Sequence, residues 1–92
     1  MPKIFEYGEY VVFFWSNEEG EPVHVHIAVR RPTENATKLW LTSDGGCIVA
    51  NNNGKIPRKD LADVTNIIML NHALICQKWV EMFGPAALAF YR

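Results

Sequence analysis

Hydrophobic and polar residues alternate along the first half of the chain, which is the pattern of half-buried β-strands. The clearest case is the segment 23–30, in which every second position is apolar: Val23, Val25, Ile27 and Val29. Side chains of a strand point alternately to the two faces of a sheet, so this pattern predicts one buried face. The intervening positions, which we expect on a solvated face, are His24, His26, Ala28 and Arg30.

The other strands of the predicted sheet lie on either side of this segment. Residues 3–7 and 9–15 are rich in β-branched and aromatic side chains, and the glycine between them predicts a tight turn or a bulge. Residues 37–42 alternate apolar and polar positions, and residues 47–50 form a short further strand between loops of turn-forming residues. We therefore expect residues 1–50 to form an antiparallel sheet of about four strands.

The second half of the chain has the periodicity of an α-helix over residues 57–83. Pro57 suits a first helical position, Asp60 favours the first turn electrostatically, and a Gly-Pro pair ends the helix. An apolar stripe at helical spacing is expected to pack on the sheet; it consists of Leu61, Val64, Ile68, Ile75, Trp79, Met82 and Phe83. The prediction is one α+β domain over residues 1–92, with one long C-terminal helix on one sheet face and a tail at 84–92.

The far side of the predicted helix carries a second apolar strip, formed by Ile67, Leu70 and Leu74. A helix that packs on a sheet with one face leaves such a strip exposed unless something covers it. The cover is either the C-terminal segment 85–92 or another protein. The sequence leaves both open, and the second would be a protein partner or a homodimer that contacts Ile67, Leu70 and Leu74.

Composition and charge narrow the classes of function. The chain has 92 residues, of which 49% are apolar and 21% charged, and its formal net charge is −1 at pH 7. No overall field therefore attracts it to nucleic acid or to an anionic membrane. The first residues lack the apolar core of a signal peptide and no apolar run is long enough to span a membrane, so we expect a cytoplasmic protein. Cys47 and Cys76 have no CxxC spacing and are expected to be free thiols.

The candidate chemistry lies at His24 and His26. They share a strand face, and two imidazoles so placed can bind one divalent metal ion together with a third ligand. Glu21 and Asp44 are the carboxylates considered for that third position. No cofactor other than such a metal is expected. His72 lies within the apolar helix stripe, where it is predicted to be a hydrogen-bonded packing residue that cannot join the pair.

Other interpretations of the same face remain open. The two histidines could act as general acid and base on a phosphodiester, with Arg30, Arg31 or Lys38 balancing the phosphate charge. The face could instead be a solvated surface without chemistry. A nucleic-acid interface in which Lys38 and Arg30 bind the backbone and Trp40 stacks on a base is less favoured, because four glutamates lie in the loops at its edge.

The chain also resembles a known family through several motifs in a fixed order. These are Gly8 before an aromatic strand, Glu21-Pro22-Val23-His24-Val25-His26-Ile27, Ala36-Thr37-Lys38-Leu39-Trp40-Leu41, Gly54-Lys55-Ile56-Pro57, and Trp79-Val80-Glu81-Met82-Phe83. Together they resemble DUF4160, a family of small bacterial cytosolic domains of unknown function, up to about Gly84. Val23 departs from many members, which have Pro or Cys at this position, and the segment 85–92 extends past their usual end.

The resemblance assigns His24 and His26 as the motif histidines, preceded by Pro22, with Trp79 as the aromatic residue at the helix end. Members are often encoded beside a second small domain, in an arrangement like that of toxin–antitoxin pairs. We therefore expect an intracellular protein-interaction component of such a pair that uses the His24/His26 face. The alternative is a histidine-dependent ribonuclease or a metal-binding hydrolase, and the resemblance leaves open whether the chain is an enzyme.

Overall fold

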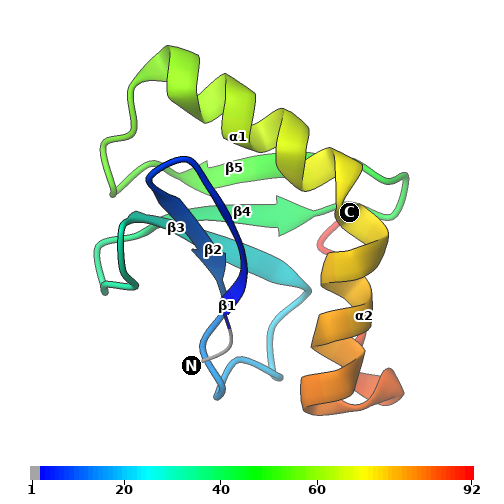
Figure 1. Cartoon of the computed structure of the whole chain (residues 1–92). Helices are drawn as coiled ribbons and strands as arrows, with labels where there is room; N and C mark the ends of the chain where they lie inside the picture. Colours follow the sequence, from blue (N-terminus) through cyan, green and yellow to red (C-terminus); the bar gives the residue numbers. More distant parts are fainter. Residues whose placement is uncertain (1–2) are drawn as a thin grey trace.

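The structure is a computed structural model that describes residues 3–92 (Figure 1). One antiparallel sheet of five strands has the strands in the order of the sequence. The strands are β1 (Lys3–Tyr7), β2 (Tyr10–Phe13), β3 (His24–Val29), β4 (Thr37–Leu41) and β5 (Cys47–Asn51). They are followed by the helices α1 (Arg58–Leu70) and α2 (His72–Phe83) and a 3₁₀ turn, η1 (Pro85–Ala87). The predicted α+β class and antiparallel sheet are confirmed, but five strands replace the four expected.

Local sequence explains why neighbouring strands pair as simple hairpins. In the β1–β2 turn, Gly8 has a φ of 59°, a left-handed conformation that glycine adopts without a steric cost. The hairpin of β3 and β4 places His24 opposite Trp40 and His26 opposite Lys38. This register determines which side chains surround the two histidines.

The helix predicted over residues 57–83 is not continuous, because it is broken at Asn71. This residue has a φ of −107° and a ψ of 19°, and its side-chain amide donates a 2.8 Å hydrogen bond to the carbonyl of Ile67. Asparagine offers the backbone such local alternatives to the regular helical ladder. As a result, α1 runs beside β5, whereas α2 turns away and passes the strand ends (Figure 1).

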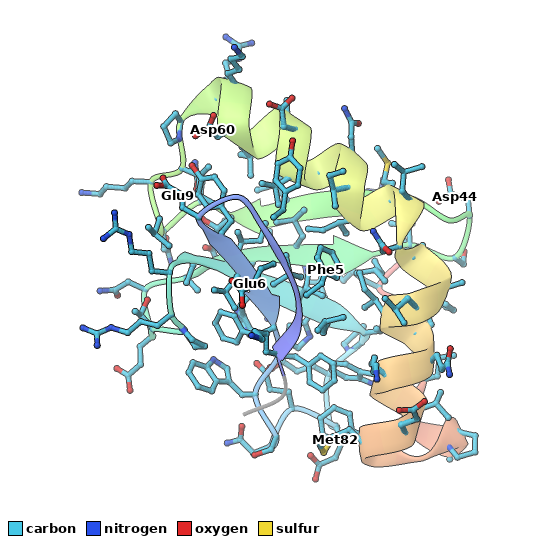
Figure 2. All side chains as sticks on the ribbon, in the orientation of Figure 1. Phe5, Glu6, Glu9, Asp44, Asp60 and Met82 are labelled. Carbon is cyan, nitrogen blue, oxygen red and sulfur yellow. The ribbon has the colours of Figure 1, made fainter. Side chains whose placement is uncertain are left out.

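The main core lies between one face of the sheet and the two helices. The helix residues that are fully buried in it are Val64, Ile68, Ile75 and Trp79. Burial of a large apolar side chain stabilises the fold by about 1.5–3 kcal/mol, so this stripe holds the helices on the sheet. Met82 is an exception to the predicted stripe, because its position near the end of α2 (Figure 2) leaves it 46% exposed.

The other face of the sheet is more covered than its sequence indicates. A second, smaller buried cluster consists of Val11, Phe13, Ala28 and Ala36, with Trp15 packed against it. His24 is also fully buried, because the rings of Trp40 and Trp79 lie against it with centroids 5.4 and 5.3 Å away. The predicted solvated face is therefore wrong for His24 and for Ala28.

The C-terminal segment returns along the molecule and joins the start of β3 to the end of β4. The N–H of Val23 donates a 2.8 Å hydrogen bond to the carbonyl of Ala89, and the N–H of Ser43 donates a 2.9 Å bond to that of Arg92. Because these bonds are made by backbone groups, they fix the path of the segment independently of its side chains. The segment is therefore an integral part of the fold.

Alternate side chains of this segment pack on two different aromatic partners. Phe90 stacks on His72 with centroids 6.0 Å apart and contacts the main core. Tyr91 stacks on Trp40 with centroids 5.0 Å apart. The Nε2–H of His72 donates a 2.7 Å hydrogen bond to the carbonyl of Thr42, in agreement with the packing role predicted for this histidine.

The two cysteines are free and half-buried. Burial raises the pKa of both thiols, so Cys47 and Cys76 stay protonated at neutral pH. Within residues 3–92, no helix combines the length and the apolar character needed to cross a membrane.

Candidate metal centre

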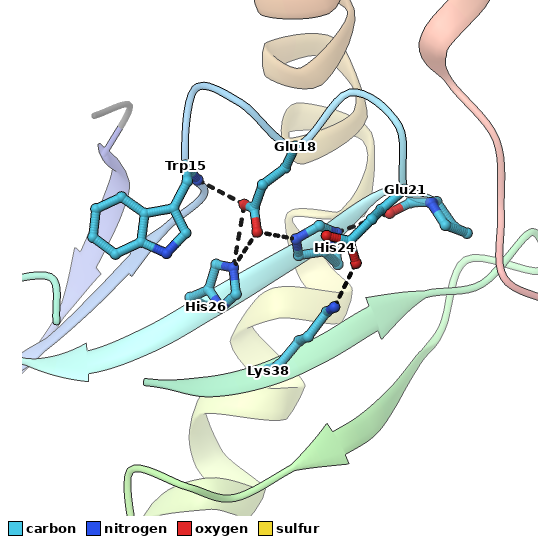
Figure 3. Close-up of polar contacts among 7 residues, drawn as sticks. Trp15, Glu18, Glu21, His24, His26 and Lys38 are labelled. Carbon is cyan, nitrogen blue, oxygen red and sulfur yellow. Dashed lines mark hydrogen bonds and ion pairs between the residues drawn. The ribbon is translucent and has the colours of Figure 1, made fainter. Parts of the chain in front are cut away.

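The loop between β2 and β3 places a carboxylate in front of the two histidines. The N–H of Trp15 donates a 2.7 Å hydrogen bond to Oε1 of Glu18, and the N–H of Glu21 donates a 3.1 Å bond to the carbonyl of Glu18. These bonds hold the loop in a turn that directs the Glu18 side chain back toward β3 (Figure 3). A loop residue thereby reaches the strand face that carries His24 and His26.

The side chains of Glu18, His24 and His26 converge. Nε2 of His26 lies 2.9 Å from Oε2 and 3.2 Å from Oε1 of Glu18. Nε2 of His24 lies 2.9 Å from the same Oε2, so one carboxylate oxygen contacts both imidazoles. The three potential ligand atoms lie within 4.8 Å of one another. Two histidines and one glutamate form the protein ligand set of several catalytic zinc sites.

The two imidazoles differ in how they meet the carboxylate. The Nε2 of His26 has the distance and the direction of a hydrogen bond to Glu18. The Nε2 of His24 has the distance but is too poorly aligned for one, and it is a buried polar atom without a hydrogen-bond partner within residues 3–92. Such atoms are rare in folded proteins, because an unsatisfied buried polar group costs free energy.

The contact made by Nδ1 of His24 determines whether Nε2 of the same neutral ring carries a proton. Nδ1 of His24 lies 2.8 Å from the carbonyl oxygen of Pro22, which can only accept, so Nδ1 carries the proton. In the neutral ring, Nε2 then carries a lone pair that faces a lone pair of the Glu18 carboxylate, so the contact is repulsive. Either a second proton on His24 or a cation between the two groups removes this repulsion.

The electrostatic surroundings keep Glu18 ionised. Burial alone would raise the pKa of its carboxyl group, but the contacts with His24 and His26 and the hydrogen bond from the Trp15 N–H outweigh this effect. The net result is a pKa well below the usual range of a glutamate. The centre therefore presents an ionised carboxylate beside two imidazole rings, and both kinds of group are found among metal ligands.

Aromatic rings enclose the centre. His26 lies against Phe13 at a centroid distance of 5.4 Å and near Trp15 at 6.4 Å. On the other side are the rings that bury His24, so every tryptophan of the chain, three in all, lies beside one of the two histidines. The exposed side-chain fractions are 0% for His24, 12% for His26 and 11% for Glu18. The centre thus has one narrow solvent-facing side, formed by His26 and Glu18.

Of the predicted binding residues, Lys38 and Trp40 lie beside the centre, because β4 pairs with β3. Nζ of Lys38 lies 2.6 Å from Oε1 of Glu21 (Figure 3). The same Nζ lies 4.1 Å from the centroid of the Trp40 ring. The potential phosphate-binding ammonium and the potential base-stacking ring are therefore both already occupied, the ammonium by a carboxylate and the ring by the ammonium and Tyr91.

Other predicted residues lie elsewhere. Arg30 follows the far end of β3, roughly 13 Å along the strand from His26, so it does not join the histidines. Asp44, considered as a third ligand, accepts hydrogen bonds from the Thr42 hydroxyl and the Gly46 N–H in its own turn. Glu21, the other candidate, is paired with a lysine. The carboxylate that reaches both histidines is instead that of Glu18.

Sequence reasoning missed Glu18 because its position depends on the path of a loop. The signal available was its place in a connection between two antiparallel strands, which must bring the chain back beside its starting point. Such a loop close to the first residue of β3 lies within reach of His24. Its direction, however, depends on the hydrogen bond from the Trp15 N–H, which no spacing in the sequence indicates.

The chain is thus a small α+β domain with a histidine–carboxylate centre enclosed by aromatic rings. It belongs to the family described as Domain of unknown function (DUF4160), which matches residues 9–80 and so includes Glu18, His24 and His26. The family predicted from the sequence motifs is confirmed. Neither the curated proteins nor the solved structures give a match.

Proposed function

We propose that this domain binds one divalent transition-metal ion, zinc first, through Glu18, His24 and His26. The observation that carries the proposal is the buried Nε2 of His24, which has no aligned hydrogen-bond partner and faces a carboxylate and a second imidazole. A metal ion accepts the lone pair of Nε2 and neutralises the carboxylate at the same time. One bound ion would thus satisfy the group that the protein alone leaves unsatisfied.

Two of the three separations between the proposed ligand atoms are already close to those around a zinc ion. Bonds of about 2.0–2.2 Å to a tetrahedral ion separate its ligand atoms by roughly 3.3 Å. The contacts of 2.9 Å between Glu18 and the histidines are only slightly shorter. The carbonyl of Pro22 on Nδ1 of His24 is also the kind of outer contact that orients metal-ligating histidines.

A protonated His24 is the competing explanation of the same geometry. In that state the imidazolium and the Glu18 carboxylate form an ion pair in which His24 is fully buried. Removal of both charges from water costs several kcal/mol for each ion, which the misaligned contact recovers poorly. A proton and a metal ion compete for the same Nε2, so the two explanations give opposite results in a binding experiment.

The proposed ligand set leaves a fourth zinc position for water. It would open toward the partly exposed side of the centre, at His26 and Glu18. Zinc lowers the pKa of a bound water enough to make hydroxide available near neutral pH. A metal-dependent hydrolase is therefore the reaction class that this centre favours, ahead of a ribonuclease that relies on the histidines alone.

The test uses tag-free protein treated with a chelator and then titrated with zinc or cobalt in a calorimeter. We expect one ion per chain, and for cobalt the visible absorption bands of a four-coordinate site. Glu18→Gln should weaken binding at least tenfold, because it removes a charged ligand while it preserves the size of the side chain. Glu21→Gln is the matched control, since this nearby glutamate is paired with Lys38 and should leave zinc affinity unchanged.

Two results would contradict the proposal. One is folded wild-type protein that takes up no zinc at stoichiometric concentration. The other is equal weakening by Glu18→Gln and Glu21→Gln, which would show only an effect of total charge. Circular dichroism of each variant separates loss of a ligand from loss of the fold.

A protein-interaction role in a toxin–antitoxin-like pair is the second candidate. Since His24 is buried, the histidine face is a poor docking surface, and the observation that favours an interaction is Leu70, which is 81% exposed. Ile67 and Leu74 are partly buried, so the available surface is centred on Leu70 and is smaller than the strip predicted from the sequence. A homodimer through this surface is the contact that purified protein can test directly.

We predict that Leu70→Ser shifts such a dimer to monomer without a loss of stability, because this side chain makes little contact within its own chain. Light scattering after size exclusion, at a series of concentrations, measures the molar mass. Met82→Ser, which also replaces an exposed apolar residue but on a different surface, should leave the mass unchanged. A wild-type protein that is monomeric at every concentration would rule out the homodimer.

A further inference from the structure

A second candidate site lies at the opposite end of β3 from the histidines. An open cavity of about 610 Å³ is formed there by the end of β3, the loop between β3 and β4, and the loop between β5 and α1. Figure 1 shows these two loops at the same end of the strands, on the left of the view. The floor is apolar and includes Ile27 and Ile56, and the rim is polar: Thr33, Asn35, Asn53 and Lys55. A volume of this size lies within the usual range of small-molecule sites.

The loop between β5 and α1 is tied to the first residue of β4, where the β3–β4 loop ends, so the cavity is built into the fold. The hydroxyl of Thr37 donates a 2.6 Å hydrogen bond to the side-chain carbonyl of Asn52, and the N–H of Gly54 donates a 3.1 Å bond to the same hydroxyl. A Cβ atom at Gly54 would lie 2.9 Å from the Thr37 hydroxyl oxygen, closer than side chains approach. Only glycine permits this close approach of the two loops.

Two basic residues beside the cavity have an unusual backbone conformation. Arg30 has a φ of 68° and Lys55 a φ of 54°, and they are the only residues other than glycine with a positive φ within residues 3–92. Glycine or asparagine would adopt this conformation at lower cost. A long cationic side chain at each position is therefore not explained by the backbone, and strained residues of this kind cluster at ligand-binding sites.

Basic residues in the segments around the cavity outnumber acidic ones, and they have no ion-pair partner among residues 3–92. Arg30 and Arg31 directly follow β3, Lys55 lies in the loop between β5 and α1, and Arg58 and Lys59 are the first residues of α1. None of these five has a carboxylate within ion-pair distance among the residues that the structure describes, whereas Lys3, Lys38 and Lys78 each have one. The acidic residues of the same segments are Glu34 and Asp60. A chain of net charge −1 thus carries a local positive end.

The rim also offers neutral hydrogen-bonding groups. The side chains of Thr33, Asn35 and Asn53 line the cavity and make no hydrogen bond within residues 3–92. Side-chain amides can pair with the edges of nucleobases, which present donors and acceptors side by side. The apolar floor can contact the flat face of a nucleobase, and the rim can hydrogen-bond to the polar edge of the base. The neighbouring cations can bind the phosphate of the same nucleotide.

We propose that this cavity binds a nucleotide, with the base between the amide groups and the phosphate between Arg30 and Lys55. The nucleotide is either free or part of a single-stranded RNA. Two separate observations carry the inference, the strained cationic residues and the polar-rimmed cavity between them. It is independent of the metal proposal, because none of the metal-binding side chains lines this cavity.

The experiment measures binding of adenosine and uridine monophosphates, of a short fluorescein-labelled single-stranded RNA, and of inorganic tripolyphosphate to the whole chain at low salt. Arg30→Gly and Lys55→Gly remove one cation each and relieve the strained backbone, so we expect weaker binding together with an unchanged or higher melting temperature. Each should reduce affinity about tenfold, as expected for loss of a charged hydrogen bond to phosphate. Lys78→Ala is the control, because it removes one positive charge from an exposed position in α2.

Asn53→Ala tests recognition of the base separately from recognition of the phosphate. It should weaken nucleotide or RNA binding and leave tripolyphosphate binding unchanged. Tighter binding of the RNA than of both monophosphates would identify single-stranded RNA as the ligand. Tighter binding of a monophosphate would identify a free nucleotide, and either result supports the site. The proposal is overturned if no nucleotide binds, if tripolyphosphate binds as tightly as the nucleotides, or if Lys78→Ala weakens binding as much as Lys55→Gly.

Discussion

Glu18 changes the chemistry of the two histidines around it. Without a carboxylate, His24 and His26 would be two neutral imidazoles on a strand, with little affinity for a single ion. The carboxylate gives both of them a common partner, and Trp15 holds it through a backbone N–H. The burial of His24 then leaves only a proton or a metal ion as the group that completes the contact.

Tyr10 is a second residue whose environment determines its ionisation. Its hydroxyl donates a 2.6 Å hydrogen bond to Oδ2 of Asp60, which joins β2 to α1. This hydrogen bond, together with burial and the negative charge of Asp60, raises the pKa of Tyr10 to about 12. The folded state therefore holds the phenolic proton more tightly than the unfolded chain, in which the pKa is about 10.

This shift predicts a loss of stability at alkaline pH. A raised pKa in the folded state contributes stability that is fully present below about pH 10 and is lost between about pH 10 and pH 12. Urea unfolding at several alkaline pH values should show a smaller decline for Tyr10→Phe than for the wild type, since phenylalanine cannot ionise. Tyr7→Phe, at an exposed position, is the control and should keep the wild-type decline. Identical slopes for all three proteins would contradict this interpretation.

At the level of single residues, the sequence predicted which two histidines lie together better than it predicted the residues around them. The pairing of His24 with His26 follows from alternation along a strand, and this local rule was sufficient. The burial of His24 was not predicted, because it depends on Trp79, which lies more than fifty positions later in the chain. Glu18 was missed for the related reason that a turn, rather than a periodic element, positions it.

At the level of elements, the apolar periodicity predicted the buried side of the helices but not the break between them. Apolar periodicity continued through residues 57–83 and predicted one helix, because a change of direction at a single residue barely disturbs the spacing of the stripe. Asn71 makes that change through its side-chain hydrogen bond to Ile67. The sequence thus predicted which side of the helical region is buried, but not the turn that brings Trp79 to His24.

The C-terminal segment gives the prediction that belongs to this scale. Phe90 is half-buried against the main core, whereas Tyr91 is 56% exposed and stacks on Trp40 from outside. We expect Phe90→Ala to lower the free energy of unfolding by about 2 kcal/mol, below the roughly 3–5 kcal/mol of truncations of fully buried aromatic residues, because the ring is only partly buried. Tyr91→Ala should cost less than about 1 kcal/mol.

Chemical denaturation with urea, followed by circular dichroism, measures both values. The comparison is informative because both variants preserve the backbone hydrogen bonds of the segment to Val23 and Ser43. If Phe90→Ala were no more destabilising than Tyr91→Ala, the segment would be a surface strap held by its backbone, and not a part of the core.

At the level of the whole molecule, the proposed metal centre connects parts of the chain that are distant in sequence. Glu18 belongs to the β2–β3 loop, the histidines to β3, and the ring of His24 packs on α2 through Trp79. The proposed nucleotide cavity lies at the other end of β3. One strand thus carries two polar sites at opposite ends, with an apolar stretch on the core side between them.

A metal ion that binds the folded state and not the unfolded chain must stabilise the whole domain. At a free zinc concentration of about 100 times the dissociation constant, this linkage contributes about 2.7 kcal/mol. For a domain of this size we therefore expect the melting temperature to rise by roughly 10–20 °C. Differential scanning calorimetry with and without a chelator measures the shift, and intrinsic fluorescence should report the same transition because the tryptophans surround the centre.

Two glutamate variants test whether the rise in melting temperature depends on the proposed metal ligand. Glu21→Gln should keep most of the zinc-dependent rise, whereas Glu18→Gln should lose it and melt at nearly the same temperature with zinc and with chelator. The protonated-histidine explanation predicts no rise for the wild type, because zinc would then have to displace a buried ion pair and would leave the melting temperature unchanged. The presence or absence of one thermal shift therefore decides whether the contact between Glu18 and His24 is completed by a metal ion or by a proton.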